Sequence, residues 1–244
     1  MSFLTLINQK IVNSIPNKLA KTFFPMQCLL CGKHTQEAHH LCTHCKNSLP
    51  IIAQGCVRCG RNLSKKGEIC GQCLKKPPPF ERAAVISPYQ PPINYLIHAL
   101  KFQSLLSTTR LFSHLLIEKF YAEYTHQGRP DILIPMPLHP HRLRQRGFNQ
   151  VVEIARMVAK ALSIPVDCKG VKRVKHTKMQ RLLSAPERHN NMRLAFKACA
   201  NYKGMTIALL DDVITTGATI NDCCRAIKFA GADQIHVWAI AMSL

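Results

Sequence analysis

Hydrophobic residues beyond position 80 fall into two alternating patterns. Short, uninterrupted apolar runs predict buried strands, and longer segments with apolar positions three or four apart predict helices. The expected strands are 83–86, 131–135, 206–211 and 235–242, and the expected helices are 93–102, 108–124, 150–162 and 218–230. Strands that alternate with helices favour an α/β fold, in which helices flank a parallel sheet. Ligands of such sheets bind beyond the carboxyl ends of the strands.

Before position 80 the organising pattern is one of cysteines. Two consecutive segments each read C-x2-C-x10-C-x2-C, and a shift of 28 residues superposes the first on the second. A C-x-x-C turn directs two sulfurs at one point, and two such turns make a tetrahedral site for Zn²⁺. The candidate metal ligands are Cys28, Cys31, Cys42, Cys45, Cys56, Cys59, Cys70 and Cys73. The spacing therefore predicts a small double zinc ribbon with two structural Zn²⁺ ions.

Some alternatives remain open for this segment. The same cysteines could form a disulfide scaffold or hold an Fe–S cluster, although the spacing is more typical of ribbons. The four turns could also pair in sequence or interleave. A segment this small lacks a core, so its metals must supply the folding energy.

The prolines at 77–79 predict an extended linker between two domains. The first is an N-terminal helix with the double zinc ribbon (1–76), and the second is the α/β domain (80–244).

The net charge of the chain favours partners that carry negative charge. The 244 residues carry 33 Lys and Arg against 13 Asp and Glu, a formal net charge of +20. The excess lies in 1–79, with 11 basic and 2 acidic residues, and in 131–200, with 14 and 4. Both regions could form surfaces that attract phosphates.

No apolar run approaches the roughly 18 residues of a membrane span, and the first ten residues lack the order of a signal peptide, so we expect a cytoplasmic protein.

One segment combines carboxylates with a candidate phosphate loop. The expected strand 206–211 ends in Asp211-Asp212, and Thr215-Thr216-Gly217-Ala218-Thr219 follow before the next helix. Two carboxylates at a strand end can hold the vicinal hydroxyls of a ribose, directly or through Mg²⁺. The small residues, the threonine hydroxyls and the helix N-terminus can then surround a phosphate. The alternative is a purely structural role, in which these residues cap the helix and the acidic pair is exposed to solvent.

Two basic segments could complete such a site. Arg142, Arg144 and Arg146 follow the expected strand 131–135, where they could neutralise a pyrophosphate, and Gly147 allows a close turn. The segment 172–197 has 8 basic residues and 1 acidic residue and predicts a loop that folds over a polyanion. The alternative for both is a solvated basic surface.

The order of motifs resembles that of the ComF family of bacterial competence and DNA-utilisation proteins over nearly the whole chain. The 207–219 run resembles the PRPP-binding signature of type I phosphoribosyltransferases. The shared motifs are the ribbons, Lys101-Phe102, Pro135-x-Pro137, Arg146-Gly147-Phe148-Asn149-Gln150, Gln180, Arg188-x-x-Asn191, Phe196 and the 207–219 run.

The resemblance implies a type I phosphoribosyltransferase domain behind a double zinc ribbon. It implies that Asp211 and Asp212 face the ribose, as possible catalytic residues, and that residues 215 to 219 bind the 5-phosphate of PRPP with Mg²⁺. It further implies a pyrophosphate loop around 135–149, which includes Asn149, and a flexible loop that includes Arg188. The role it implies is the handling of single-stranded DNA during natural transformation and DNA uptake.

Three functions compete on this basis. The first is a competence protein that binds single-stranded DNA and PRPP or a ribose 5-phosphate group. The second is a phosphoribosyltransferase that transfers ribose 5-phosphate from PRPP to a nucleobase or related acceptor. The third is an adaptor whose zinc ribbons dock a helicase or recombination partner. The few, scattered aromatics (7% of the chain) mean that any grip on DNA would be mainly electrostatic.

Overall fold

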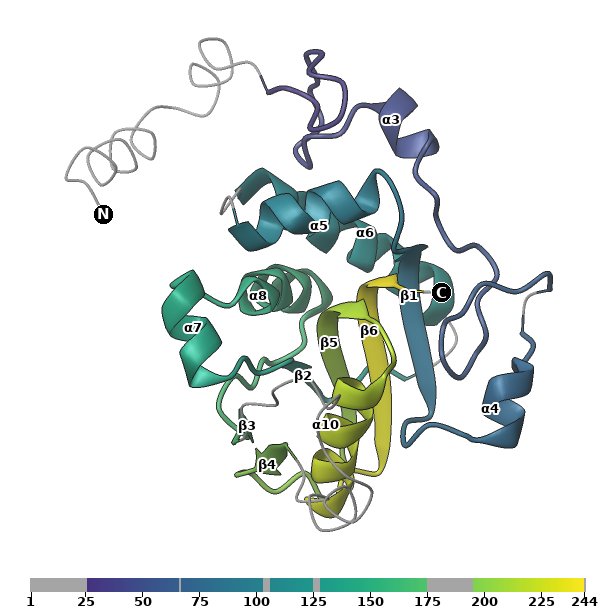
Figure 1. Ribbon diagram of the computed structural model, residues 1–244, viewed down its shortest axis with the longest axis vertical. Coiled ribbons are helices and arrows are strands. Elements are labelled where there is room, and N and C mark those ends of the chain that lie inside the picture. The colour runs from purple at the N-terminus through teal and green to yellow at the C-terminus, as the bar shows by residue number, and fades with distance from the viewer. Residues whose placement is uncertain (1–25, 66, 103–105, 125–127, 175–194, 244) are drawn as a thin grey trace, which may run out of the picture. The chain divides into compact units, whose positions relative to one another are not determined.

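The computed structural model describes residues 26–65, 67–102, 106–124, 128–174 and 195–243 (Figure 1). The chain divides into two compact units, Met1–Ser48 and Leu49–Leu244. The first unit holds the first cysteine cluster, and the second unit holds the other cluster together with the α/β fold. Within the described residues, we find no helix with the length and apolar character that crossing a membrane requires.

The second unit is built on a four-stranded parallel sheet of order β1-β6-β5-β2. Its strands are β1 (Arg82–Pro88), β2 (Ile132–Pro135), β5 (Thr206–Ile214) and β6 (Gln234–Met242). Every residue of β6 after Gln234 is buried, as expected for a strand covered on both faces. The predicted α/β fold is confirmed.

Helices cover both faces of this sheet (Figure 1). They are α5 (Ile93–Phe102), α6 (Leu106–Tyr124) and α8 (Gln150–Leu162) on one face and α10 (Ala218–Phe229) on the other. Side chains of β6 alternate between these faces. Val237 belongs to the core that includes α10, whereas Trp238 packs against Phe120 and Tyr124 of α6. The small antiparallel pair β3 (Val171–Arg173) and β4 (Phe196–Ala198) contributes Val171 and Phe196 to the α10 side of the core.

Several elements differ from the sequence expectation. Both ends of the segment 172–197, which was expected to be a loop, belong to the strands β3 and β4. The expected loop between β2 and α8 contains a helix, α7 (Pro140–Arg146). Pro140 at its first turn, His139 as its N-cap and left-handed Gly147 at its C-cap explain why this short polar segment forms a helix. Strand β5 continues to Ile214, three residues beyond the expected end, because it pairs with β6 as far as Met242.

The two ribbons carry one short helix each, α3 (Thr43–Asn47) and α4 (Gly71–Lys75). The second ribbon is joined to β1, an edge strand of the sheet. Ala83 donates its backbone N–H to the carbonyl of Val57 at 3.2 Å, and the backbone N–H of Ile52 donates to Ile86 at 2.8 Å.

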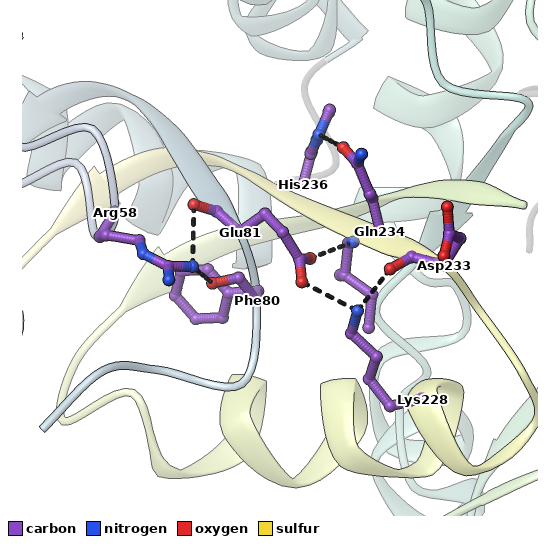
Figure 2. A network of polar contacts seen from close by, with 8 residues as sticks. Arg58, Phe80, Glu81, Lys228, Asp233, Gln234 and His236 are labelled. Carbon is purple, nitrogen blue, oxygen red and sulfur yellow. Dashed lines mark hydrogen bonds and ion pairs between the residues drawn. The ribbon is translucent and has the colours of Figure 1, made fainter.

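Arg58, inside the Cys56–Cys59 turn, adds a side-chain link between the second ribbon and the sheet. Figure 2 shows its Nη1 reaching the carbonyls of Phe80 and Glu81, at 3.0 and 3.3 Å. The Glu81 carboxylate in turn pairs with Lys228 of α10 at 2.8 Å and accepts the backbone N–H of Ile235. The ribbon, the edge strand and the end of α10 are therefore connected by polar contacts.

Candidate functional site

The acidic pair lies near the carboxyl end of β5, in the centre of the sheet. Oδ2 of Asp212 is 3.0 Å from Nζ of Lys101 on α5 and accepts a hydrogen bond of 2.9 Å from Nε2 of Gln150 on α8. The backbone N–H of Asp212 donates to Oδ1 of Asp211 at 2.8 Å. Asp212 is buried and held by two side chains, whereas Asp211 is half-buried and its carboxylate accepts only that backbone hydrogen bond among the described residues.

The electrostatics of the pair are unequal. Burial, followed by the negative charge of Asp212, raises the pKa of Asp211 well above its ordinary value. Lys101 and Arg173 oppose this rise because their positive charges favour the ionised carboxylate. Asp211 therefore sits where additional positive charge, or a hydrogen-bond donor, would be stabilising.

A cavity of about 460 Å³ opens beside these carboxylates. Its volume is in the range of small-molecule sites. The lining residues that the sequence had singled out are Asp211, Asp212, Thr215, Gly217, Thr219, Arg142 and Arg146. Strand β5, its loop and α7 thus meet at one concave site, at the edge of the sheet where ligands of parallel sheets bind.

The turn into α10 has the geometry of an anion loop. Gly217 is its N-cap with φ 75°, a left-handed conformation that glycine adopts without strain. The Thr216 hydroxyl accepts the backbone N–H of Ala218 at 3.4 Å, so Thr216 stabilises the turn instead of lining the cavity. Thr215 and Thr219 are exposed at the cavity.

Other residues of the sequence prediction take different positions. Asn149 caps α8 by accepting the backbone N–H of Val151 at 3.1 Å, and it donates to the carbonyl of Met136 at 3.1 Å. Arg144 and Gly147 are exposed and do not line the cavity. Arg188 and most of the 172–197 segment lie outside the described residues.

Among the charged and amide side chains that line the cavity, Lys101 and Gln150 had been noted only as parts of shared motifs, and Arg173 only as one residue of the basic segment 172–197. Lys101 and Gln150 meet Asp212 although they lie 111 and 62 positions away in the chain. Arg173 on β3 lies over the ring of Phe196, with 5.5 Å from Cζ to the ring centroid. Burial and the charge of Arg142 lower the pKa of Arg173.

The cysteines form two separate clusters that pair in sequence. One contains Cys28, Cys31, Cys42 and Cys45, and the other contains Cys56, Cys59, Cys70 and Cys73, with all ligand atoms of a cluster within 4.8 Å of one another. The Sγ atoms of Cys31 and Cys42 are 3.8 Å apart, and those of Cys59 and Cys70 are 3.7 Å apart. A tetrahedron with Zn–S bonds of about 2.3 Å requires sulfur separations of about 3.8 Å. The sulfur geometry therefore fits Zn²⁺, and the interleaved alternative is wrong.

The thiols within one cluster differ in acidity. Burial opposes ionisation of Cys28, but backbone N–H groups lower its pKa to about 6. Burial and the neighbouring sulfurs raise the pKa of Cys45 to about 12. A bound cation is what would keep all four sulfurs as thiolates.

Comparison with known proteins agrees with this arrangement. The family model "Double zinc ribbon domain" matches residues 19–74, and "Phosphoribosyl transferase domain" matches residues 150–242. The chain is 35% identical to Competence protein F of Haemophilus influenzae over 219 residues, which cover 88% of this chain and 89% of that protein. The chain belongs to the Competence protein F (ComF) family.

Other relatives extend this comparison. DNA utilization protein YhgH of Escherichia coli K12 is 31% identical over 223 residues, which cover 90% of this chain and 98% of that protein. Among solved structures, a purine phosphoribosyltransferase from Pyrococcus horikoshii is 20% identical with a TM-score of 0.35 and covers 55% of this chain and 73% of its own. The ComF-family membership thus rests on the curated relatives and the family models.

Proposed function

We propose that this ComF-family chain binds a ribose 5-phosphate group, as carried by PRPP, in the cavity at the carboxyl edge of its sheet. The observation that carries the proposal is the convergence of Asp211 and Asp212, the Thr215–Thr219 loop and three arginines on one cavity. Carboxylates suit sugar hydroxyls, whereas arginines and a helix N-terminus suit phosphates. A sugar with a phosphate group at each end matches carboxylates that lie between the Thr215–Thr219 loop and the arginines.

The two carboxylates have different parts in this proposal. Lys101 and Gln150 fix Asp212, so its free oxygen accepts a ribose hydroxyl from a constant position. Asp211, raised in pKa and half-buried, accepts the second hydroxyl. Gln150 is 1% exposed, and its Oε1 has no hydrogen-bond partner within the described residues, which leaves a buried acceptor for a donor in the cavity.

The phosphate groups would occupy the two sides of the cavity. The 5-phosphate fits the Gly217 turn, with the hydroxyls of Thr215 and Thr219 as donors. The pyrophosphate of PRPP fits the side of Arg142, Arg146 and Arg173. Mg²⁺ suits this arrangement because it binds through one or two carboxylates together with phosphate oxygens.

A ligand titration tests the cavity. The chain is titrated with Mg²⁺-PRPP in a thermal-shift assay and by calorimetry, alongside Asp211→Asn and the control Asp222→Asn. Asp222 is an acidic residue of α10 that does not line the cavity and pairs with Arg225 on the outer side of the helix. At one hundred times Kd the ligand should stabilise the native chain and the control by about 2.7 kcal/mol. Absence of any shift in the native chain overturns the proposal.

We further propose that the chain binds single-stranded DNA. The net charge of +20 supports this function, as do the names of the relatives, a competence protein and a DNA utilization protein. Binding that is mainly electrostatic must weaken as salt rises, with a slope of about −0.7 per phosphate contacted. Fluorescence anisotropy with a labelled oligo(dT) at 50 to 200 mM salt measures this slope, and an affinity that does not depend on salt contradicts the proposal.

A further inference from the structure

A shallow groove lies at the C-terminal end of α10, away from the cavity. It is bounded by Phe229 and Gly231 on one side and by Lys197, Asn201 and Lys203 on the other. Phe229 is 84% exposed, the highest value among the large apolar side chains of the described residues. No acidic side chain lines the groove in the described part of the chain. It therefore presents an aromatic ring between positive charges.

The exposure of Phe229 follows from the helix geometry. Cys223, Cys224 and Ile227 form the buried side of α10 and pack into the sheet core. Phe229 lies on the opposite side, with Arg225 one turn before it. An exposed ring of this size has no role in the core, and its burial by a flat partner would be favourable.

The groove is held in shape by the backbone. Tyr202 donates its N–H to the carbonyl of Ala230 at 2.8 Å, and Gly204 donates to Gly231 at 3.2 Å. Gly231 has φ 93°, and a Cβ there would lie 3.1 Å from Cα of Lys203, so glycine is favoured at this close approach. The loop with Lys203 is thus fixed against the end of the helix that carries Phe229, and little ordering is required on binding.

The charge on the adjacent hairpin is also unusual. Lys172 of β3 and Lys197 of β4 are direct partners in the antiparallel register, and both are exposed. Like charges directly opposite each other destabilise a strand pair. An anion that lies against both lysines would relieve this repulsion.

We propose that this surface, defined by Phe229, Lys203, Lys197 and Lys172, is a binding site for single-stranded nucleic acid, in which a base stacks on Phe229 and the lysines contact the backbone phosphates. The inference rests on the proposed DNA-binding function and gives it a location. An exposed aromatic ring in a basic groove is the combination that binds single strands without sequence preference. A duplex keeps its bases stacked and offers none to Phe229.

The site is independent of the ribose-phosphate cavity. Gly217 and Phe229 are at opposite ends of α10, which is about 18 Å long by its 12 residues. Changes at Phe229 should therefore leave Mg²⁺-PRPP binding unchanged. This separation allows the two functions to be tested in the same variants.

The decisive experiment uses Phe229→Trp as a reporter. The chain has one tryptophan, Trp238, which is 2% exposed, so an added indole at 229 dominates any change on binding. We expect oligo(dT) to quench its fluorescence, salt to reverse the quenching, and a duplex of equal length to leave it unaffected. If anisotropy shows that oligo(dT) binds while the indole is not quenched, the site is elsewhere and the proposal is overturned, although DNA binding stands.

Alanine variants measure how much each side chain contributes to the affinity for oligo(dT). Phe229→Ala should weaken oligo(dT) binding by roughly 5- to 100-fold, the range for loss of one stacked base. The matched control is Tyr95→Ala, because Tyr95 is 68% exposed on α5. Replacing Lys172, Lys197 and Lys203 together by alanine should reduce the salt slope by about 2, compared with about 0.7 or less for the control Lys160→Ala.

Two further outcomes overturn the site. If Phe229→Ala changes the oligomeric state in light scattering and not the DNA affinity, Phe229 contacts a second copy of the chain. If the native chain does not bind oligo(dT) at any salt concentration, the proposed DNA-binding function fails, and this site fails with it. Circular dichroism and the Mg²⁺-PRPP shift confirm that each variant is folded.

Discussion

The two zinc ribbons have the same local structure but different surroundings. Each contains an isolated antiparallel bridge, Gln27 with His34 in the first and Gly55 with Asn62 in the second, at the same 28-residue offset as the cysteines. The N-caps of their helices, Cys42 and Cys70, have the same backbone angles within a degree. The metal-binding pattern therefore fixes the local fold of both ribbons.

The differences lie in residues that do not bind metal. Arg58 of the second ribbon reaches the carbonyls of Phe80 and Glu81, whereas the corresponding position in the first ribbon is Leu30. Gly60 lies against Val85 of β1, whereas no atom of the described residues lies within 4 Å of the place where a Cβ of residue 32 would be. The second ribbon thus contacts the sheet through turn residues that differ from those of the first, in addition to its backbone hydrogen bonds with β1.

The largest expected effect comes from removing one metal ligand in each ribbon. Cys73→Ser should lower the unfolding free energy of the 49–244 unit by more than about 3 kcal/mol, because the second ribbon holds the edge of its sheet. Cys45→Ser should also release one zinc but shift the main unfolding transition by less than about 0.5 kcal/mol. Calorimetry with zinc analysis measures both, and equal shifts would show that the ribbons are equally integrated.

The next effect concerns the glycines of the two turns. Gly32→Ala and Gly60→Ala both place alanine at positive φ, which costs about 1–2 kcal/mol. At Gly60 the new Cβ would clash with Cγ2 of Val85, so its total cost should reach about 2–4 kcal/mol. Denaturant unfolding should show that adding Val85→Ala rescues part of the Gly60→Ala loss. Strict additivity of the two changes would contradict this contact.

A smaller effect is expected from Arg58→Leu, which gives the second ribbon the residue of the first. Loss of the two hydrogen bonds to Phe80 and Glu81 should cost about 1–2 kcal/mol in unfolding free energy. Arg58→Lys keeps the charge but not the planar fork, and it should recover less than half of this loss. Leu30→Ala is the counterpart in the first ribbon and should leave the main transition in place. Zinc content should stay unchanged in all three variants.

The smallest expected effect is a dependence of stability on pH that comes from the sheet and not from either metal site. Burial, followed by the charge of Arg82, lowers the pKa of His236 on β6 to about 4. The unfolded chain, with a His pKa near 6.5, binds this proton first, so stability is lost as the pH falls from 6.5 towards 4. Between pH 7.5 and 5.5 we expect a loss of about 1 kcal/mol that His236→Gln removes. The exposed His98→Gln is the control, and denaturation with excess zinc measures the slopes.

Much of this architecture could be predicted from the sequence, because local patterns determine it. The helix over 93–102 and the helix over 150–162 match α5 and α8 in their bounds, since each has a continuous apolar side. The eight cysteine ligands were predictable from their spacing, whereas their pairing in sequence was established only by the structure. Helix α7 was missed because it buries no side chain, so its segment lacks a hydrophobic period.

The candidate site was predictable only in part. The acidic pair and the Gly217 turn are contiguous in the chain, and their chemistry is visible in a short run of residues. Lys101, Gln150 and Arg173 come from three other elements, and only the folded sheet brings them to the same cavity. The polar link from Arg58 through Glu81 to Lys228 was invisible for the same reason, because it joins residues up to 170 positions apart.

The position of the second ribbon along β1 has a consequence for solubility. A bare edge strand offers its amides and carbonyls to any other chain and so promotes aggregation. Here the backbone groups of Ile52 and Val57 occupy part of that edge. Removal of zinc from the second ribbon by a chelator should therefore expose the edge of β1 and promote aggregation. When zinc is scarce, the first consequence would then be self-association of the protein, before any change in its binding of other molecules.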